Sequence, residues 1–278
     1  MPDFFEEVDS IGIVEQHIQG VLKLEESKAN ALLRRYKDIR QDLRDRLDFI
    51  PGDTFSAQQL RGVLTQVDAA ITAMSISLST GMQEQAGIFA LRGVEDGITE
   101  LQKFEKIFQG AVVPININRM LAAQETSNFL LNKYEASISA YSEDLRASIV
   151  GSLTNEALAE SPLSSVVRRL GQFFVGEEWK LLRIARTEFH NIYNLGKQNS
   201  LTEVRDEVLP DLMKTLMHPM DSRTGADSIA LAKENPIVPI DEPFVQEWRG
   251  KKFIFMTPPN RPNDRAVLVP YRDAWQRD

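Results

Sequence analysis

Two long stretches without proline in the first half of the chain constrain the fold more than any other feature. Between Glu15 and Asp48, apolar residues recur at steps of three and four, with charged residues between them. Between Leu60 and Leu78 the spacing alternates between four and three, the 3.5-residue period of helices that pack against each other. The pattern predicts two amphipathic helices in a hairpin or coiled coil, joined by a turn at residues 51–56, "PGDTFS".

Further helices are expected up to about residue 174. Several glycines loosen the pattern of the second helix, so we expect a break or bend between residues 81 and 97. The β-branched stretch 110–118, "GAVVPININ", predicts an extended connector, and a helix should run from about 119 to 148 or beyond. A short helix is expected at 161–174, introduced by a serine and a proline. The apolar seam predicts the core of a helical bundle, with a surface for a partner helix or subunit as the alternative.

Composition limits the functions that the chain can have. Among its 278 residues there is no cysteine, which excludes disulfides, a thiolate nucleophile and cysteine-ligated metal sites. The formal net charge of −8 disfavours broad binding to nucleic acid, although local basic patches remain open. The first ten residues, "MPDFFEEVDS", are acidic where a secretory signal is basic, and no run approaches the ~20 apolar residues of a membrane span. We therefore expect a cytoplasmic location and no contact with a membrane.

The stretch 183–200, "RIARTEFHNIYNLGKQNS", predicts the main part of a helix over about 179–200 with one wholly polar face. That face holds Arg183, Arg186, Thr187, His190, Asn191, Asn194, Lys197 and Gln198. Threonine and asparagine are mediocre helix formers, so their central position indicates hydrogen bonds to another part of the chain. Glu188 lies at the edge of the apolar side, where burial would require a partner such as Arg223 or Arg265.

Residues 214–275 differ in character from the helical part. Short β-branched or aromatic runs alternate with prolines, which predicts two or three short strands joined by turns. The stretch 218–228, "HPMDSRTGADS", is expected to be a loop, and the prolines of 258–271 should hold an extended backbone from which Arg261, Asn263, Asp264 and Arg265 project. We expect these loops to pack on the polar helix face and to complete its hydrogen bonds.

Chemical sites are weakly indicated. His218, Asp221 and Asp227 are close in sequence, but the spacing of a calcium loop is absent. Neither a Gly-x-Ser-x-Gly elbow nor a phosphate-binding loop nor a dinucleotide fingerprint occurs. The alternative to a structural protein is a metal-dependent nuclease or transferase that uses Glu188, His190, Asp221 and Arg223 in a cleft. We predict no catalytic residue, no metal and no cofactor.

Four short elements follow one another in the second half: "ARTEFHNIYNLGK" (185–197), "DSRT" (221–224), "IDEPF" (240–244) and "PPNRPNDR" (258–265). In this order they resemble the bacteriophage head-morphogenesis family, the minor head proteins similar to the F protein of phage Mu. The resemblance covers roughly residues 150–275, and the first half agrees with it only in being helical. It gives structural roles to Arg186, Thr187, Glu188, Asn194, Gly196, Asp221, Arg223, Thr224, Asp241, Phe244, Asn263 and Arg265.

Many members of that family carry His and Cys in the last element and Cys after the second, which suggests a metal site. Here Asn260, Asn263 and Asp264 stand in the last element, and Asp227 and Ser228 follow the second, so no zinc site is expected.

The resemblance implies a minor head protein without enzymatic activity that is taken into the procapsid and aids head assembly, genome packaging or ejection. Its expected partners are the portal protein, the scaffold or major capsid protein, and copies of itself; contact with DNA is open but disfavoured by the net charge. The expected location is the interior of the virion capsid, and the host cytoplasm during assembly. The fold expected is a mostly α-helical α+β fold: an elongated helical interaction region at 1–150, then a compact domain at 151–278 with a small β-sheet and proline-rich loops.

Overall fold

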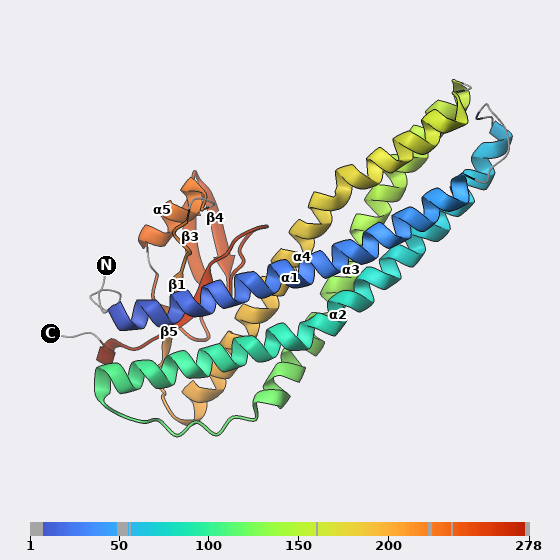
Figure 1. Ribbon diagram of the computed structural model, residues 1–278. Coiled ribbons are helices and arrows are strands. Elements are labelled where there is room, and N and C mark those ends of the chain that lie inside the picture. The colour runs from blue at the N-terminus through green and yellow to red at the C-terminus, as the bar shows by residue number, and fades with distance from the viewer. Residues whose placement is uncertain are drawn as a thin grey trace. The chain divides into compact units, whose positions relative to one another are not determined.

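The computed structural model describes residues 8–48, 55, 57–159, 161–221, 224–234 and 236–275. Four long helices dominate it (Figure 1): α1 (Val8–Leu47), α2 (Ala57–Gln109), α3 (Arg119–Leu158) and α4 (Leu163–Glu207). Small antiparallel sheets follow them in the sequence, so the predicted fold class, a mostly helical α+β protein, is confirmed. The turn predicted at 51–56 lies outside the described residues apart from Phe55. No helix within the described ranges combines the length and the apolar character that a membrane span needs.

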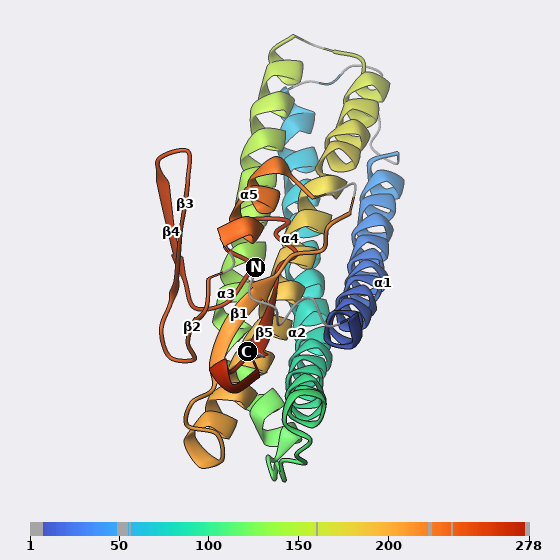
Figure 2. The same ribbon diagram turned by 90° about the vertical axis from the view of Figure 1, so that its left-hand side faces the viewer.

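The C-terminal part has more secondary structure than the sequence predicted. Two or three strands were expected, but the described residues contain five, in two sheets (Figure 2). The first sheet has the order β2 (Val238–Pro239), β1 (Met213–Met217), β5 (Val267–Tyr271), and the second is the hairpin of β3 (Phe244–Trp248) and β4 (Lys251–Phe255). A helix, α5 (Ala226–Glu234), begins inside the stretch expected to be a loop, and a 3₁₀ turn, η2 (Asp273–Trp275), follows β5.

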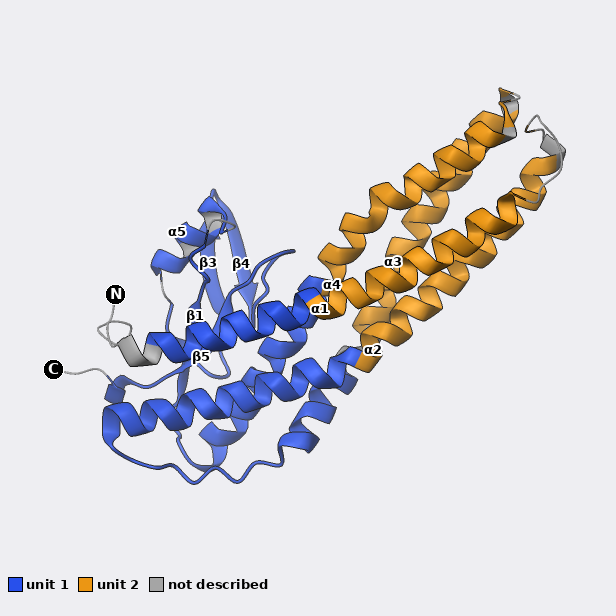
Figure 3. Ribbon diagram, in the orientation of Figure 1, with its two compact units in different colours: residues 1–26, 85–130, 186–278 blue, residues 27–84, 131–185 orange. Residues whose placement is uncertain are grey.

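The chain forms two compact units (Figure 3), each made of separate segments. Unit 1 comprises residues 1–26, 85–130 and 186–278, and unit 2 comprises 27–84 and 131–185. All four long helices contribute residues to both units. Each unit therefore combines residues from both sides of position 150, where the sequence suggested a domain boundary.

The heptad seam forms the core of unit 2, as the sequence predicted. Tyr36 is fully buried and its hydroxyl donates a hydrogen bond of 2.7 Å to the carbonyl oxygen of Phe174, which joins α1 to α4. Ile71 of α2 and Tyr134 of α3 are also fully buried. Because a buried tyrosine hydroxyl needs a hydrogen-bond partner, this bond fixes how the α1 and α4 segments of unit 2 pack against each other.

The break predicted between residues 81 and 97 is wrong, since α2 is continuous from Ala57 to Gln109. Its glycines instead allow α2 and α4 to approach closely in unit 1. A Cβ atom on Gly93 would lie 2.0 Å from the carbonyl oxygen of Tyr193, and one on Gly196 would lie 2.5 Å from that of Ala90. No side chain larger than a hydrogen atom fits at either position.

Two other predictions about the helical part had different outcomes. The short helix at 161–174 and the polar helix at 179–200 are one helix, α4. The connector 110–118 has neither helix nor strand, as predicted. Its Ile115 and Ile117 pack against a cluster of buried residues that includes Val94 and Ile98 of α2, which holds the connector to unit 1.

Candidate functional site

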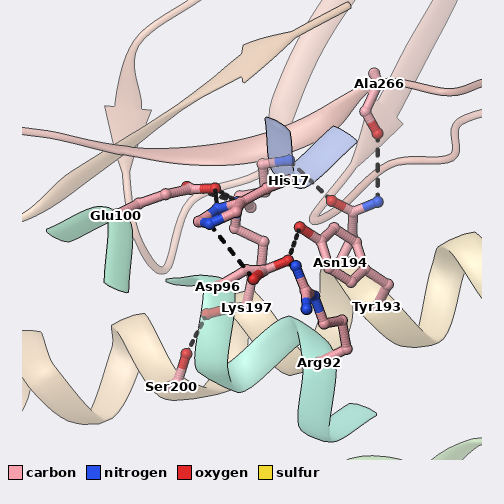
Figure 4. Close-up of polar contacts among 10 residues, drawn as sticks. His17, Arg92, Asp96, Glu100, Tyr193, Asn194, Lys197, Ser200 and Ala266 are labelled. Carbon is pink, nitrogen blue, oxygen red and sulfur yellow. Dashed lines mark hydrogen bonds and ion pairs between the residues drawn. The ribbon is translucent and has the colours of Figure 1, made fainter. Parts of the chain in front are cut away.

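The polar face of α4 is covered by the C-terminal segment, which confirms the contact that the sequence predicted. Asn194 is fully buried, and both polar atoms of its side-chain amide bond the backbone where β5 begins (Figure 4). Its Nδ2 donates to the carbonyl oxygen of Ala266 at 3.3 Å, and its Oδ1 accepts the N–H of Leu268 at 2.8 Å. One asparagine thus satisfies two backbone groups where β5 begins, as buried amides require.

Two further side chains of this face bind other loops of the tail. Gln198 donates from Nε2 to the carbonyl oxygen of Ile240 at 2.7 Å, and Thr187 accepts the N–H of Asn263 at its hydroxyl oxygen, 3.2 Å away. Asn263 has φ near +61°, a left-handed conformation that asparagine tolerates better than most residues. We call these contacts, with those of Asn194, the α4–tail cluster.

Asp221 and Arg265 form a second link within the tail. The guanidinium donates from Nη1 and Nη2 to the two carboxylate oxygens, both at 2.7 Å, and the hydroxyl of Thr224 lies 3.3 Å from both side chains. The hydrogen bond to Asp221 raises the pKa of Arg265, against the opposing effect of burial. Of the two partners expected for Glu188, Arg265 thus directs both of its terminal nitrogens to Asp221. Glu188 itself is buried, with 7% of its surface exposed. Arg223 lies outside the described residues.

The other residues singled out from the sequence are also placed in unit 1. Arg186 is half-buried, and Gly196 faces Ala90 where α2 and α4 approach closely. Asp241 is exposed and its carboxylate lies 3.0 Å from Nη1 of Arg205. Phe244 is fully buried, with its ring centroid 5.5 Å from that of Phe255. The predicted residues on α4 and those on the C-terminal segment thus belong to one packed region.

His190 has both ring nitrogens engaged inside the protein. Nδ1 lies 2.5 Å from Oε1 of Glu25 on α1, and Nε2 lies 2.7 Å from the carbonyl oxygen of Ala266. Both partners only accept hydrogen bonds when the carboxylate is ionised, so both nitrogens must carry protons. Burial lowers the pKa of His190, but attraction to Glu25, the two hydrogen bonds and the charge of Asp264 outweigh burial and raise it. The raised pKa and the two enclosed ring nitrogens favour a protonated His190, which suits a structural role better than that of a general base.

A buried ionic network that was not predicted from the sequence lies beside the α4–tail cluster (Figure 4). The ammonium of Lys197 on α4 lies 2.7 and 2.6 Å from the two carboxylate oxygens of Glu100 on α2, and neither side chain has exposed surface. His17 of α1 approaches the same carboxylate, with Nδ1 2.8 Å from Oε1. The network therefore joins α1, α2 and α4 of unit 1 through one carboxylate.

Asp96 extends the network by one turn of α2. Arg92 donates from Nε to its Oδ2 at 2.8 Å, and the hydroxyl of Tyr193 donates to the same oxygen at 3.0 Å. Burial, followed by the charges of Glu100 and Asp96, raises the pKa of Tyr193 well above its ordinary value, so its hydroxyl stays a donor. A sequence signal existed: Asp96 and Glu100 are four residues apart, as are Tyr193 and Lys197, and such pairs share one helix face.

The cations in this ionic network are side chains of the protein itself. Lys197 occupies the position between carboxylate oxygens where a bound cation would lie in an ion site. In the part of the chain that the structure describes, no three His, Asp or Glu side chains are grouped closely enough to hold a metal ion. Of the metal ligands considered from the sequence, His218 is buried and Asp221 is bound by Arg265, while the side chain of Asp227 lies outside the description.

Comparison with known proteins gives no match that bears on this site. The chain matches no protein-family model, no curated protein and no solved structure. The interpretation of the site therefore depends on the contacts of its residues and on the resemblance of the four sequence elements.

The ion pair of His190 predicts how stability depends on pH. Because the pKa of His190 is raised by folding, its contribution is fully present below the ordinary histidine pKa of about 6.5 and is lost as the pH rises through the raised value. The free energy of unfolding of the wild type should therefore fall over that interval. The double substitution His190→Gln with Glu25→Gln keeps polar groups at both positions but removes the charges. Urea denaturation from pH 5 to 9 should give the double variant a flatter profile, and equal slopes would contradict the prediction.

The paired donors of Arg265 predict that lysine cannot replace it. Arg265→Lys should lower the free energy of unfolding by about 1 to 2 kcal/mol, because an ammonium cannot reproduce the two parallel hydrogen bonds to a carboxylate that is itself one-third exposed. Arg34→Lys, at an exposed position of α1, is the matched control and should change stability little. Equal denaturation midpoints for the two variants would show that the two parallel hydrogen bonds of Arg265 do not matter for stability.

Proposed function

We propose that this protein is a minor head protein of a bacteriophage, taken into the procapsid with the portal protein and acting there without catalysis. One observation supports the proposal above the others: the four sequence elements that resemble the head-morphogenesis family meet in one region of unit 1. Thr187 of the first element accepts a hydrogen bond from Asn263 of the last. Asp221 of the second pairs with Arg265 of the last. Elements that are far apart in sequence thus depend on one another.

The third element joins the same region. Ile240, its first residue, accepts the hydrogen bond of Gln198, one residue after the first element. Phe244, its last residue, is buried beneath the ammonium of Lys214, which lies 5.2 Å from the ring centroid. Residues with such contacts fix a domain rather than bind a substrate, which supports the structural roles proposed for the motif.

The rival proposal, a metal-dependent nuclease or transferase, is less well supported by the geometry. It requires Glu188, His190 and Asp221 to face a substrate. His190 has 1% of its surface exposed and Glu188 has 7%, and the carboxylate of Asp221 is bound by both terminal nitrogens of Arg265. A side chain that is enclosed and hydrogen-bonded in this way cannot take up a proton from a bound substrate without a rearrangement of unit 1.

Assembly experiments test the proposal directly. The chain is co-expressed with the portal, scaffold and major capsid proteins of the phage genome that encodes it, and procapsids are separated on a density gradient. We expect the chain inside the particles, protected from added protease, when the portal is present, and depleted when the portal gene is omitted. A chain that stays in the soluble fraction in both cases would refute the proposal.

A separate measurement tests for binding to DNA, the other partner considered from the sequence. Binding of the purified chain to duplex DNA is measured at 50 and 200 mM salt, since contacts to phosphates weaken steeply with salt. With a net charge of −8 we expect no strong binding at either concentration. Tight binding with a steep salt dependence would instead place the protein on the packaged genome.

A further inference from the structure

Unit 2 carries a groove between the last turns of α1 and the first half of α4, from Arg40 to Asp48 on one side and from Ser164 to Gly176 on the other. Its volume is about 1020 Å³. Leu43, Leu47, Leu170 and Phe174 form an apolar floor, and Val175 on the wall has 56% of its surface exposed. A groove of this size, apolar at the bottom and open to solvent, can accept several side chains of another segment.

The rim of the groove is basic although the chain as a whole is acidic. Among the described residues that line it are Arg40, Arg44 and Arg168, against one carboxylate, that of Asp48. Arg40 is held by Glu178, with Nη1 2.6 Å from Oε1, whereas Arg44 and Arg168 are exposed. In a chain with a net charge of −8, this local excess of positive charge favours an acidic occupant.

Two glycines leave the α4 side of the groove bare. Within the described part of the chain, nothing lies within 4 Å of the position that a Cβ atom would take on Gly171 or on Gly176. Gly93 and Gly196 differ, because the packing of unit 1 fills the equivalent space there. Since glycine weakens a helix relative to alanine, and the fold gains no internal contact from these two, they serve mainly to deepen the groove.

We propose that the groove binds the N-terminal segment, residues 2–7, of a second copy of this chain. That segment reads "PDFFEE", and residues 1–7 lie outside the described part of the chain. Phe4 and Phe5 supply aromatic anchors for an apolar floor, and aromatic anchors in pockets carry much of the energy of protein interfaces. The carboxylates of the segment match Arg44 and Arg168 on the rim, since guanidinium groups bind carboxylates with paired donors.

The occupant comes from another copy because the segment cannot reach the groove along its own chain. The segment precedes the first turn of α1, whereas the groove lies at the last turns of that helix. A helix of 40 residues is about 60 Å long, and the six residues of the segment span at most about 22 Å. The contact therefore joins two different surfaces of neighbouring copies, so copies can add head to tail. This inference does not depend on the proposed function.

The first test measures binding of a synthetic peptide of residues 1–10, labelled at its C-terminus, to the full-length chain by fluorescence anisotropy. We expect saturable binding that is weakened about tenfold by Arg44→Glu with Arg168→Glu, because two attractions become repulsions. The matched control is Arg34→Glu with Arg61→Glu, which makes the same change of net charge at exposed positions outside the groove. Binding that falls equally in both double variants, or that does not occur, would overturn the proposal.

Charge exchange and self-association complete the test. A peptide in which Asp3, Glu6 and Glu7 are replaced by Arg should bind the Arg44→Glu, Arg168→Glu variant better than the wild type. The mass of the wild-type chain in sedimentation equilibrium should rise with concentration, and removal of residues 2–7 should keep it monomeric. A wild-type chain that is monomeric at all concentrations, or one whose association survives the deletion, would show that this groove does not join copies of the chain. Circular dichroism confirms that each variant is folded.

Discussion

Replacing Lys197 by methionine should lower the free energy of unfolding by about 3 to 5 kcal/mol, the usual cost of removing one partner of a buried ion pair. Methionine keeps the length and most of the volume of the side chain, so little of the loss comes from packing. The loss arises because the carboxylate of Glu100, which has no exposed surface, loses the ammonium that binds both of its oxygens. Equilibrium denaturation in urea, followed by circular dichroism at 222 nm, measures the change.

Two further variants identify the cause of that loss. Lys103→Met, at an exposed position of the same unit, makes the same chemical change and should alter stability by no more than about 0.5 kcal/mol. Lys197→Met combined with Glu100→Leu should be more stable than Lys197→Met alone, because it removes the uncompensated carboxylate. If Lys197→Met and Lys103→Met had equal effects, or if the second substitution made the loss worse, the buried pair would not be the source.

The parts of the fold that follow from local patterns were predictable from the sequence. The seam of α1 and α2 has a clear helical period, and its residues, such as Tyr36 and Ile71, are buried in unit 2. The polar face of α4 was predictable for another reason: Thr187 and Asn194 weaken a helix, and a structure retains them where they bond other segments. Both signals are contained within a few turns of sequence.

The missed features depend on which segments meet. Lys197 belonged to the predicted polar face, but nothing near it in sequence indicates that its partner is Glu100 of α2. In the same way, Asp221 receives both terminal nitrogens of Arg265, because the tail folds its own loop onto the arginine. A sequence identifies side chains that need partners when buried, whereas the tertiary fold decides among partners of the same charge. The division into units is of this kind too, since each unit assembles segments of every long helix.

The glycines of α2 have a role opposite to the one that their helix propensity predicts. Glycine lowers helix propensity, so a run of glycines in a helical pattern predicts a bend. In α2 the helix stays continuous, and Gly93 lies where the backbone of α4 approaches. The cost in propensity is offset by close packing, which a single sequence does not reveal. The distinction can be measured, because the same helix also contains a glycine without such a contact.

Gly93→Ala should therefore lower the free energy of unfolding by about 3 kcal/mol, at the upper end of the range for overpacking. The new methyl group would lie 2.0 Å from the carbonyl oxygen of Tyr193, a backbone atom that no change of rotamer can move. Gly87→Ala in the same helix, where nothing lies within 4 Å, should instead raise stability by about 0.5 to 1 kcal/mol, since alanine is the better helix former. The two substitutions are chemically identical, so opposite signs in urea denaturation would isolate the contact between α2 and α4. Stabilisation by both would mean that α2 and α4 do not approach this closely at Gly93.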